Sequence, residues 1–167
     1  RDVAPSRGLG DVYKRQFVEY LCNKENLTVS EVLNILNKKS GMLGMTGISS
    51  DYRDVSAAAE AGNQDAINCL EAYAYRIIKY IGSYIAAMGG VDVITFTAGL
   101  GENAIPLRET ICKAFEFMGL EFDSEANNCR GVEKIITKEG SKITACVIPT
   151  NEEIAICEET VELVKGK

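Results

Sequence analysis

Apolar residues recur at helical spacing along much of the chain and alternate with short runs of β-branched residues. The longest helical stripe lies within residues 63–88, where apolar side chains follow one another at steps of three and four. Gly89 and Gly90 end this pattern. A shorter helix is predicted after Thr28, which forms a capping box with Glu31, and we expect it to stop at Gly41. The members of the long stripe are Ile67, Leu70, Ala74, Ile77, Ile81, Tyr84 and Met88.

Two β-branched runs, residues 91–97 and 142–150, are typical of buried strands. Shorter strands are expected over residues 119–123 and 131–137. A helix running through Met118 should follow the first buried strand, and a last helix should begin at a cap formed by Thr150 and Glu153. Because helices and strands alternate, the pattern predicts an α/β fold.

The segment between the two predicted helices has a different character. Gly41, Gly44 and Gly47 stand three apart among apolar residues, and a polar run follows from Ser49 to Asp54. This spacing favours a tight loop over a helix.

Composition narrows the class of protein. The 167 residues are 46% hydrophobic and 25% charged, which is ordinary for a globular domain. A net charge of −6 argues against a nucleic-acid partner or an anionic membrane, and no apolar run is long enough to span a membrane. With no histidine, this chain alone provides no histidine base, triad or metal ligand. The six scattered cysteines form no CxxC pair, which favours reduced thiols in a cytoplasmic protein.

The first sixteen residues differ from the rest. They hold four of the 18 basic residues, show no helical or alternating pattern, and do not begin with methionine. We expect residues 1–16 to be an unrelated or non-native tail, and residues 17–167 to form the domain.

The strongest chemical signal is the glycine turn after the first buried strand. Gly99 and Gly101 allow backbone amides to approach a ligand at a helix N-terminus, a place that favours a phosphate or nucleotide. An ordinary tight turn remains the alternative. The turn is not a Walker A loop, and as a dinucleotide fingerprint it lacks its third glycine, which would fall at Ile105. Glu121 and Asp123 stand near where that fold needs an acidic ribose ligand, so an oxidoreductase reading stays open.

Three segments, SSDYRD, FTAGLGEN and IPTNEE, occur in this order around the long predicted helix. Together they resemble the acetate kinase family, and the resemblance runs from about Phe17 to the C-terminus. It implies the C-terminal, nucleotide-binding half of the actin-like, sugar kinase (ribonuclease H-like) ATPase fold, with a mixed sheet flanked by helices. It also implies transfer of a phosphoryl group from ATP to acetate, giving acetyl phosphate and ADP, with Mg²⁺ as cofactor.

The resemblance also assigns residues. It implies nucleotide-binding roles for Asp51, Tyr52 and Arg53, with a helix cap and a surface charge as the alternative explanation of the aspartate and the arginine. It implies a magnesium ligand at Glu152, where a first-turn glutamate complementing the helix dipole is the alternative. Leu100 and Tyr52 depart from the family's usual residues but keep an apolar wall. The second nucleotide segment consists of Gly99, Leu100, Gly101, Glu102 and Asn103.

In the family, the carboxylic-acid pocket and the catalytic arginines, aspartate and histidine belong to the preceding half of the chain. We therefore expect this chain to be inactive alone, to bind a small carboxylate only with that half, and to form a homodimer in acetyl-CoA biosynthesis. A propionate or butyrate kinase and a non-catalytic nucleotide-binding or dimerising module remain alternatives. Arg108 and Arg130 are expected on the solvated surface.

Overall fold

The computed structural model of the protein describes residues 8–165, with the side chains of residues 8–15 and of Glu152 left out. The chain divides into two compact units whose boundary falls between Glu71 and Ala72. This boundary lies inside a continuous helix, so no loop or linker in the sequence marks it.

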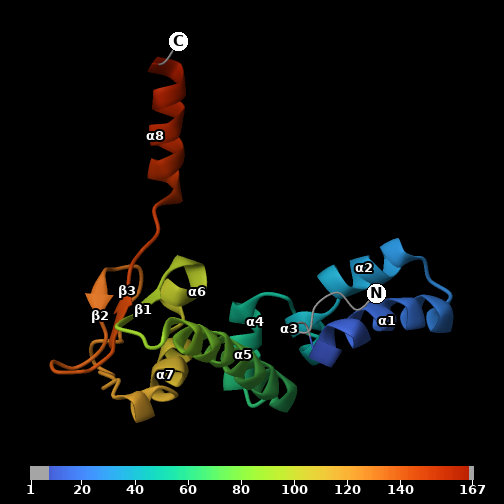
Figure 1. The fold of residues 1–167 in the computed structure, drawn as a ribbon, viewed down its shortest axis with the longest axis horizontal. Coiled ribbons are helices and arrows are strands. Elements are labelled where there is room, and N and C mark those ends of the chain that lie inside the picture. Colours follow the sequence, from blue (N-terminus) through green and yellow to red (C-terminus); the bar gives the residue numbers. More distant parts are fainter. Residues whose placement is uncertain (1–7, 166–167) are drawn as a thin grey trace. The chain divides into compact units, whose positions relative to one another are not determined.

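The first unit is helical. It contains α1 (Gly8–Glu25), α2 (Val29–Lys38), α3 (Gly41–Thr46), α4 (Tyr52–Glu60) and the beginning of α5 (Gln64–Met88) (Figure 1). The predicted capping box is confirmed, because Glu31 N donates to Thr28 Oγ1 and Thr28 N donates to a Glu31 carboxylate oxygen. A small core of Val55, Ala66 and Cys69 joins α4 to the first turns of α5.

Helix α1 crosses the boundary expected at residue 16. Its backbone is helical from Gly8, so residues 8–16 continue into the helix that carries the half-buried Val18, Leu21 and Cys22. Residues 1–7 lie outside the described residues. A different origin for residues 1–16 stays a prediction.

The loop predicted over the three glycines is wrong, since α3 occupies Gly41–Thr46. Gly47 closes α3 in a left-handed conformation with φ +66°, and its N–H donates to Leu43 O, while Gly41 takes φ +60° where α3 begins. Gly44 lies within the helix, where a Cβ would come 3.0 Å from Lys39 O, so its small size serves close packing of the backbone. The spacing of three suited a helix as well as a loop.

The second unit holds the rest of α5 and a three-stranded mixed sheet flanked by helices (Figure 1). Its strands are β1 (Val93–Phe96), β2 (Lys134–Ile135) and β3 (Thr144–Val147). In the order β1-β3-β2, β3 pairs parallel to β1, with Val93 opposite Thr144, and antiparallel to β2. The helical elements after β1 are α6 (Ala98–Asn103), α7 (Ile105–Lys113), a 3₁₀ turn (Glu116–Met118) and α8 (Glu152–Lys165). The predicted α/β class is confirmed.

The strands agree with the predictions only in part. Both β-branched runs contain strands, but β1 is buried on one face only, through Ile94 and Phe96. The strand expected over residues 119–123 is wrong: this segment makes a single bridge, Phe122 to Thr137. It does not continue as a strand, because Asp123 accepts hydrogen bonds from two backbone amides that close a turn.

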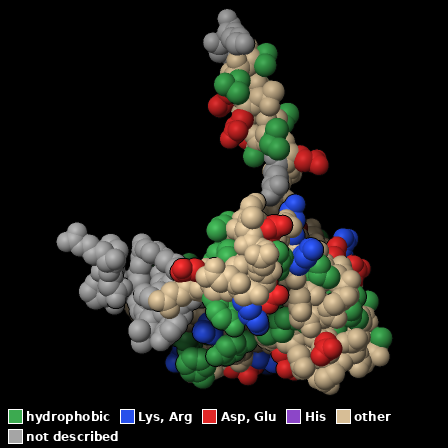
Figure 2. All heavy atoms as spheres, turned by 90° about the vertical axis from the view of Figure 1, so that its right-hand side faces the viewer, with side chains coloured by type: hydrophobic (Ala, Val, Ile, Leu, Met, Phe, Trp, Pro, Cys, Tyr) green, Lys and Arg blue, Asp and Glu red, His purple; other side chains and the backbone are tan. Residues whose placement is uncertain are grey.

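The predicted long helix is confirmed as α5, and its stripe is buried or half-buried as far as Ile81 but exposed beyond it. Ala74 is buried, whereas Tyr84 is 63% and Met88 65% exposed, and Ile85 is the buried residue near the end. Helix α8 also carries exposed apolar side chains, which Figure 2 shows interspersed with acidic ones. No helix in the described part of the chain is long and apolar enough to cross a membrane. All six cysteines are free thiols.

Candidate functional site

The glycine turn predicted after the first strand is the short helix α6. Thr97 precedes it in extended conformation, and Ala98 takes φ +58°, a left-handed conformation that is uncommon for a residue with a side chain. Such outliers gather at functional sites, where the surrounding structure holds them in place. The chain turns again at Ala104 and enters α7, whose first turn contains Pro106.

The two glycines of the turn have different roles. A Cβ at Gly101 would lie 3.0 Å from the carbonyl carbon of Phe96, so only glycine allows α6 to pack this closely on the end of β1. A Cβ at Gly99 would meet nothing within 4 Å. Gly101 therefore serves packing, while Gly99 leaves open space on the surface of the turn.

Asn103 ends α6 and braces it. Its Nδ2 donates to Gly99 O at 2.9 Å, and its side chain is exposed. The side-chain carbonyl oxygen is an acceptor suited to an amino group such as that of adenine. Leu100, between the glycines, is half-buried.

Arg108 in α7 holds this turn through hydrogen bonds to its backbone. The prediction that Arg108 is a surface residue is wrong. It is fully buried, and its Nη1 donates to Gly101 O at 2.9 Å and to Glu102 O at 2.8 Å. The rest of the guanidinium binds the loop after residue 126: Nε donates to Asn127 Oδ1 at 2.8 Å, and Nη2 donates to the carbonyls of Asn127 and Cys129.

Burial lowers the pKa of the Arg108 guanidinium, but an arginine stays protonated in a protein, so the charge persists inside the unit. No carboxylate among the described residues pairs with it, and its hydrogen bonds go to neutral oxygens and, at 3.8 Å, to Cys129 Sγ. Burial also raises the pKa of the Cys112 thiol to about 12, so that neighbour is neutral as well. Arg130 is exposed, as predicted.

A signal for the buried arginine was present in the sequence. Arg108 stands within the apolar stripe of α7, and its neighbours on that stripe are buried. A charged residue at a core position must find acceptors, and Asn127 in the following loop provides two. The other buried members of the stripe are Ala104, Leu107, Ile111, Cys112 and Phe115.

The carboxylate of Glu102 connects α6 to the segment that leaves β3. Its Oε1 accepts hydrogen bonds from Thr150 N at 2.9 Å and from Thr150 Oγ1 at 3.0 Å. Thr150 therefore does not cap the last helix, contrary to prediction. Asn151 does so instead, because its Oδ1 accepts from Ile154 N at 3.1 Å.

The expected metal ligand, Glu152, begins α8. Its side chain lies outside the described residues. Among the side chains that are described, no group of three or more acidic or cysteine residues is arranged to hold a metal ion.

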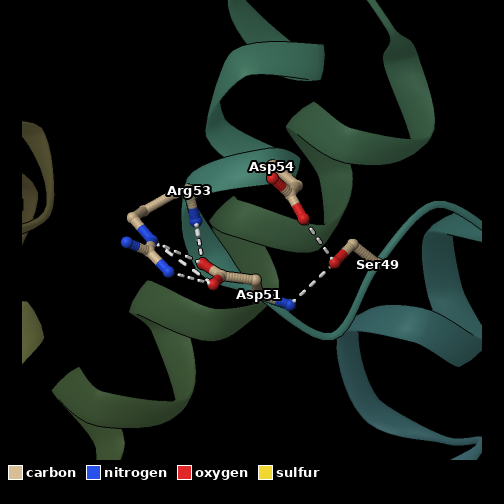
Figure 3. A network of polar contacts seen from close by, with 4 residues as sticks. All are labelled: Ser49, Asp51, Arg53 and Asp54. Atoms are coloured by element: carbon tan, nitrogen blue, oxygen red, sulfur yellow. Dashed lines mark hydrogen bonds and ion pairs between the residues drawn. The ribbon is translucent and has the colours of Figure 1, made fainter.

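The third predicted segment, Asp51 to Arg53, forms a compact network at the start of α4 (Figure 3). Asp51 caps the helix by accepting from Arg53 N at 2.8 Å, and both of its carboxylate oxygens also accept from the Arg53 guanidinium, the shortest contact being 2.6 Å. Ser49 accepts from Asp51 N and donates to Asp54 Oδ2 at 2.7 Å. The helix cap considered from sequence is therefore present, and it contains the ion pair as well.

The Arg53 guanidinium lowers the pKa of the Asp51 carboxyl to about 2, first through their side-chain hydrogen bonds and then through the backbone N–H of Arg53. The same pair raises the pKa of Arg53. The Arg53 side chain is 85% exposed, so its charge is accessible to a ligand from solvent. Tyr52, between the two, is half-buried and has interactions of its own.

The structure thus brings two of the three predicted segments together. FTAGLGEN and IPTNEE meet in the second unit through Glu102 and Thr150. SSDYRD belongs to the first unit, where Asp51 and Arg53 are already paired.

Comparison with known proteins agrees with these features. The acetate kinase of Lachnoclostridium phytofermentans is 55% identical over 147 residues, which cover 88% of this chain and 37% of that protein. The crystal structure of Porphyromonas gingivalis acetate kinase matches with a TM-score of 0.81 and 43% identity over 98% of this chain and 39% of that one. A propionate kinase structure from Francisella tularensis matches with a TM-score of 0.73 and 32% identity, covering 90% of this chain and 36% of that one.

These relatives are kinases of short carboxylic acids, and their structures share the α/β architecture described above. The sequence model of the acetokinase family matches residues 8–158, and the chain belongs to this family. The match begins within the expected tail, at residue 8. The chain spans a little over a third of the length of the relatives, in their C-terminal half.

The family assignment removes the oxidoreductase alternative. That reading needed an acidic side chain to bind a ribose, and Asp123 instead uses its Oδ1 to accept the backbone N–H groups of Glu125 and Ala126. The turn before α7 is accordingly part of a kinase fold.

Proposed function

We propose that the protein to which this chain belongs transfers a phosphoryl group from ATP to acetate, giving acetyl phosphate and ADP. In this proposal the chain contributes the nucleotide site and part of the magnesium site. The main support for this proposal is the family match over residues 8–158. The matched region includes the glycine turn, which Arg108 holds, and the segment around Thr150, which binds the turn through Glu102.

The adenosine of the nucleotide binds over the turn at Gly99 to Asn103. The space above Gly99 and the exposed amide of Asn103 support this role, since a purine needs a flat, accessible surface and a hydrogen-bonding group at its edge. Asp51, Tyr52 and Arg53 also contact the nucleotide. The exposed fork of Arg53 suits a phosphate or the face of adenine, and Asp51 holds that fork in place.

Magnesium is bound by Glu152, directly or through water. A single carboxylate fits this ion, because Mg²⁺ prefers hard oxygen ligands and fills much of its coordination shell with water and nucleotide phosphates. A complete protein cage is therefore not required. When bound, the ion would neutralise charge on the phosphates, and this chain would supply the carboxylate of Glu152, the first residue of α8.

The groups nearest the reacting phosphate come from the part of the relatives that precedes the region matched here. Phosphoryl transfer requires cations that converge on the transferred group, and this chain supplies only some of them. We further propose that the whole protein is a cytoplasmic homodimer in which the exposed apolar face of α5 meets its symmetry mate, and that it serves acetyl-CoA biosynthesis.

Propionate is the second candidate acceptor. The propionate kinase of Francisella tularensis shares 32% identity with this chain, so this region alone does not separate the acids. Butyrate kinases and a non-catalytic nucleotide-binding or dimerising role are the remaining alternatives. The kinase alternatives share much of this nucleotide half and differ in the acid pocket, whereas a non-catalytic module would act by association without turnover.

The decisive experiment joins this chain to the N-terminal portion of the Lachnoclostridium phytofermentans acetate kinase and measures acyl phosphate as hydroxamate. We expect turnover with ATP and acetate in the joined protein and none in the 167-residue chain. Comparing kcat/KM for acetate, propionate and butyrate ranks the acids. A folded joined protein without turnover would contradict the kinase proposal, and turnover by the 167-residue chain would contradict the assignment of the catalytic groups elsewhere.

Nucleotide binding is tested separately by calorimetry with Mg-ATP. Arg53→Gln and Asn103→Ala should each weaken binding. Unchanged affinity in both would remove these residues from the site.

A further inference from the structure

We propose that Glu102 is a positioning residue whose carboxylate couples the glycine turn to the segment that leads into α8. The functional side of this inference rests on the proposed nucleotide and magnesium roles of the two segments. Its structural side rests on contacts within the second unit alone.

The coupling is a two-point contact between residues 48 positions apart in sequence. Thr150 donates both its backbone N–H and its hydroxyl to the same oxygen, Glu102 Oε1, at 2.9 and 3.0 Å. A charged acceptor makes each of these hydrogen bonds stronger than one between neutral groups. Two donors on one oxygen also fix the orientation of Thr150, which a single bond would leave free to rotate.

Each end of the contact is attached to a fixed part of the unit. The carbonyl of Glu102 accepts from the buried guanidinium of Arg108, so the backbone that carries the carboxylate is anchored. On the other side, Ile148 N donates to Phe96 O at the end of the parallel ladder, and Asn151 caps α8. Thr150 lies between Ile148 and Asn151, and its hydrogen bonds to Glu102 connect α6 to the segment that follows β3.

It follows that the nucleotide turn and the start of α8 hold each other in position. Glu102 acts on the ligand through Thr150 and the backbone, and its carboxylate is already occupied by two donors. A direct ligand role for the same carboxylate predicts a different mutational pattern, because then its charge would matter and Thr150 would not.

Hydrogen exchange of the 167-residue chain tests the coupling without any ligand. Glu102→Ala should accelerate exchange of the amides of residues 150–155 by about tenfold, as expected for loss of a hydrogen bond to a charged group. Thr150→Val, which keeps the shape but removes the hydroxyl, should accelerate exchange across residues 99–104. Glu102→Gln retains an acceptor oxygen and should have the smallest effect. Glu109→Ala is the matched control, because Glu109 is a glutamate of the same unit that pairs with Lys113 on α7.

Reciprocal acceleration in Glu102→Ala and Thr150→Val, absent in the control, supports the coupling. Wild-type rates after residue 150 in Glu102→Ala, or equal acceleration by Glu109→Ala, would overturn it.

Kinetics of the joined protein test the functional consequence. Glu102→Ala and Thr150→Val should each raise the KM for ATP several-fold with the KM for acetate unchanged, and the double variant should be no worse than Glu102→Ala alone. Glu102→Gln, which keeps an acceptor oxygen but loses its charge, should be impaired less than Glu102→Ala. Additive losses, or a Glu102→Gln enzyme as impaired as Glu102→Ala, would mean that the carboxylate acts on the ligand itself and would overturn the inference. A wild-type joined protein without turnover would count against the proposed function only, since the exchange measurement decides the coupling independently.

Discussion

At the scale of single residues, the ion pair of Asp51 and Arg53 determines a measurable titration. The pKa of Asp51 is lowered to about 2 by Arg53, from an ordinary value of 3.8. A lowered pKa in the folded state means that the pair adds stability above about pH 4, and that this contribution is lost as the pH falls toward 2. We expect carboxyl NMR of the chain to give a midpoint near 2 for Asp51, returning toward its ordinary value in Arg53→Gln. An unchanged midpoint in that variant would contradict the pairing.

Because the pair is exposed to solvent, salt should weaken it. Raising the ionic strength should move the Asp51 midpoint upward.

Arg108 leads to a prediction about stability. Replacing it with leucine leaves the carbonyls of Asn127 and Cys129 and the side-chain oxygen of Asn127 without their donor, and each unsatisfied buried polar group costs about 1–3 kcal/mol. The free energy of unfolding should therefore fall by at least about 3 kcal/mol in Arg108→Leu. Arg130→Leu, at an exposed arginine, should change it by no more than about 0.5 kcal/mol in urea denaturation. Equal effects of the two substitutions would contradict the anchoring role.

Sequence and structure agree unevenly at this scale. The capping box of Thr28 and Glu31 was predictable because both partners lie within one turn. The contacts of Arg108 with Asn127 and Cys129, 19 and 21 residues away, and of Glu102 with Thr150, 48 residues away, were not predictable, because no local pattern connects such distant residues. Position within an apolar stripe would have indicated that Arg108 is buried, but not which carbonyls it binds.

At the scale of elements, the turn from β1 into α6 depends on one glycine more than on the other. Gly101→Ala would bring its Cβ to 3.0 Å from the backbone of Phe96, which cannot give way as a flexible side chain can. We expect it to displace α6 and to lower the free energy of unfolding by about 1–3 kcal/mol. Gly99→Ala has open space and should leave stability unchanged or raise it by a few tenths of a kcal/mol, since alanine favours a helix. Thermal denaturation of the two variants makes the comparison.

The turn also shows why elements were easier to predict than their ends. A long periodic stripe predicted α5 correctly, and β-branched runs predicted the two principal strands. Short helices such as α3 and α6 were predicted as loops or turns, because glycine favours either and tertiary packing decides. Asn151 caps α8 in place of Thr150, because Thr150 donates its hydrogen bonds to the distant carboxylate of Glu102.

At the scale of the whole molecule, the chain's surface is informative. The chain spans a little over a third of the length of its relatives. Large apolar side chains are exposed on both α5 and α8. Exposed apolar side chains gathered on one face of a helix are typical of an interface. The family resemblance implies a homodimer but does not identify its contact residues. The exposed end of the α5 stripe provides candidates for them.

The proposed homodimer gives the last prediction. Tyr80, Tyr84 and Met88 follow one another at steps of four along α5 and are 53%, 63% and 65% exposed, so together they form one apolar stripe. If this stripe meets a second copy of the chain, Tyr84→Glu should shift the sedimentation coefficient of the joined protein from dimer toward monomer, because a carboxylate buried without a partner is strongly disfavoured. Tyr75→Glu is the matched control: the same substitution on the same helix, at a tyrosine that is also 63% exposed but stands on the opposite side from Tyr84. Dissociation by Tyr84→Glu and not by Tyr75→Glu assigns the interface to the stripe, whereas a dimer that survives Tyr84→Glu shows that another surface forms it.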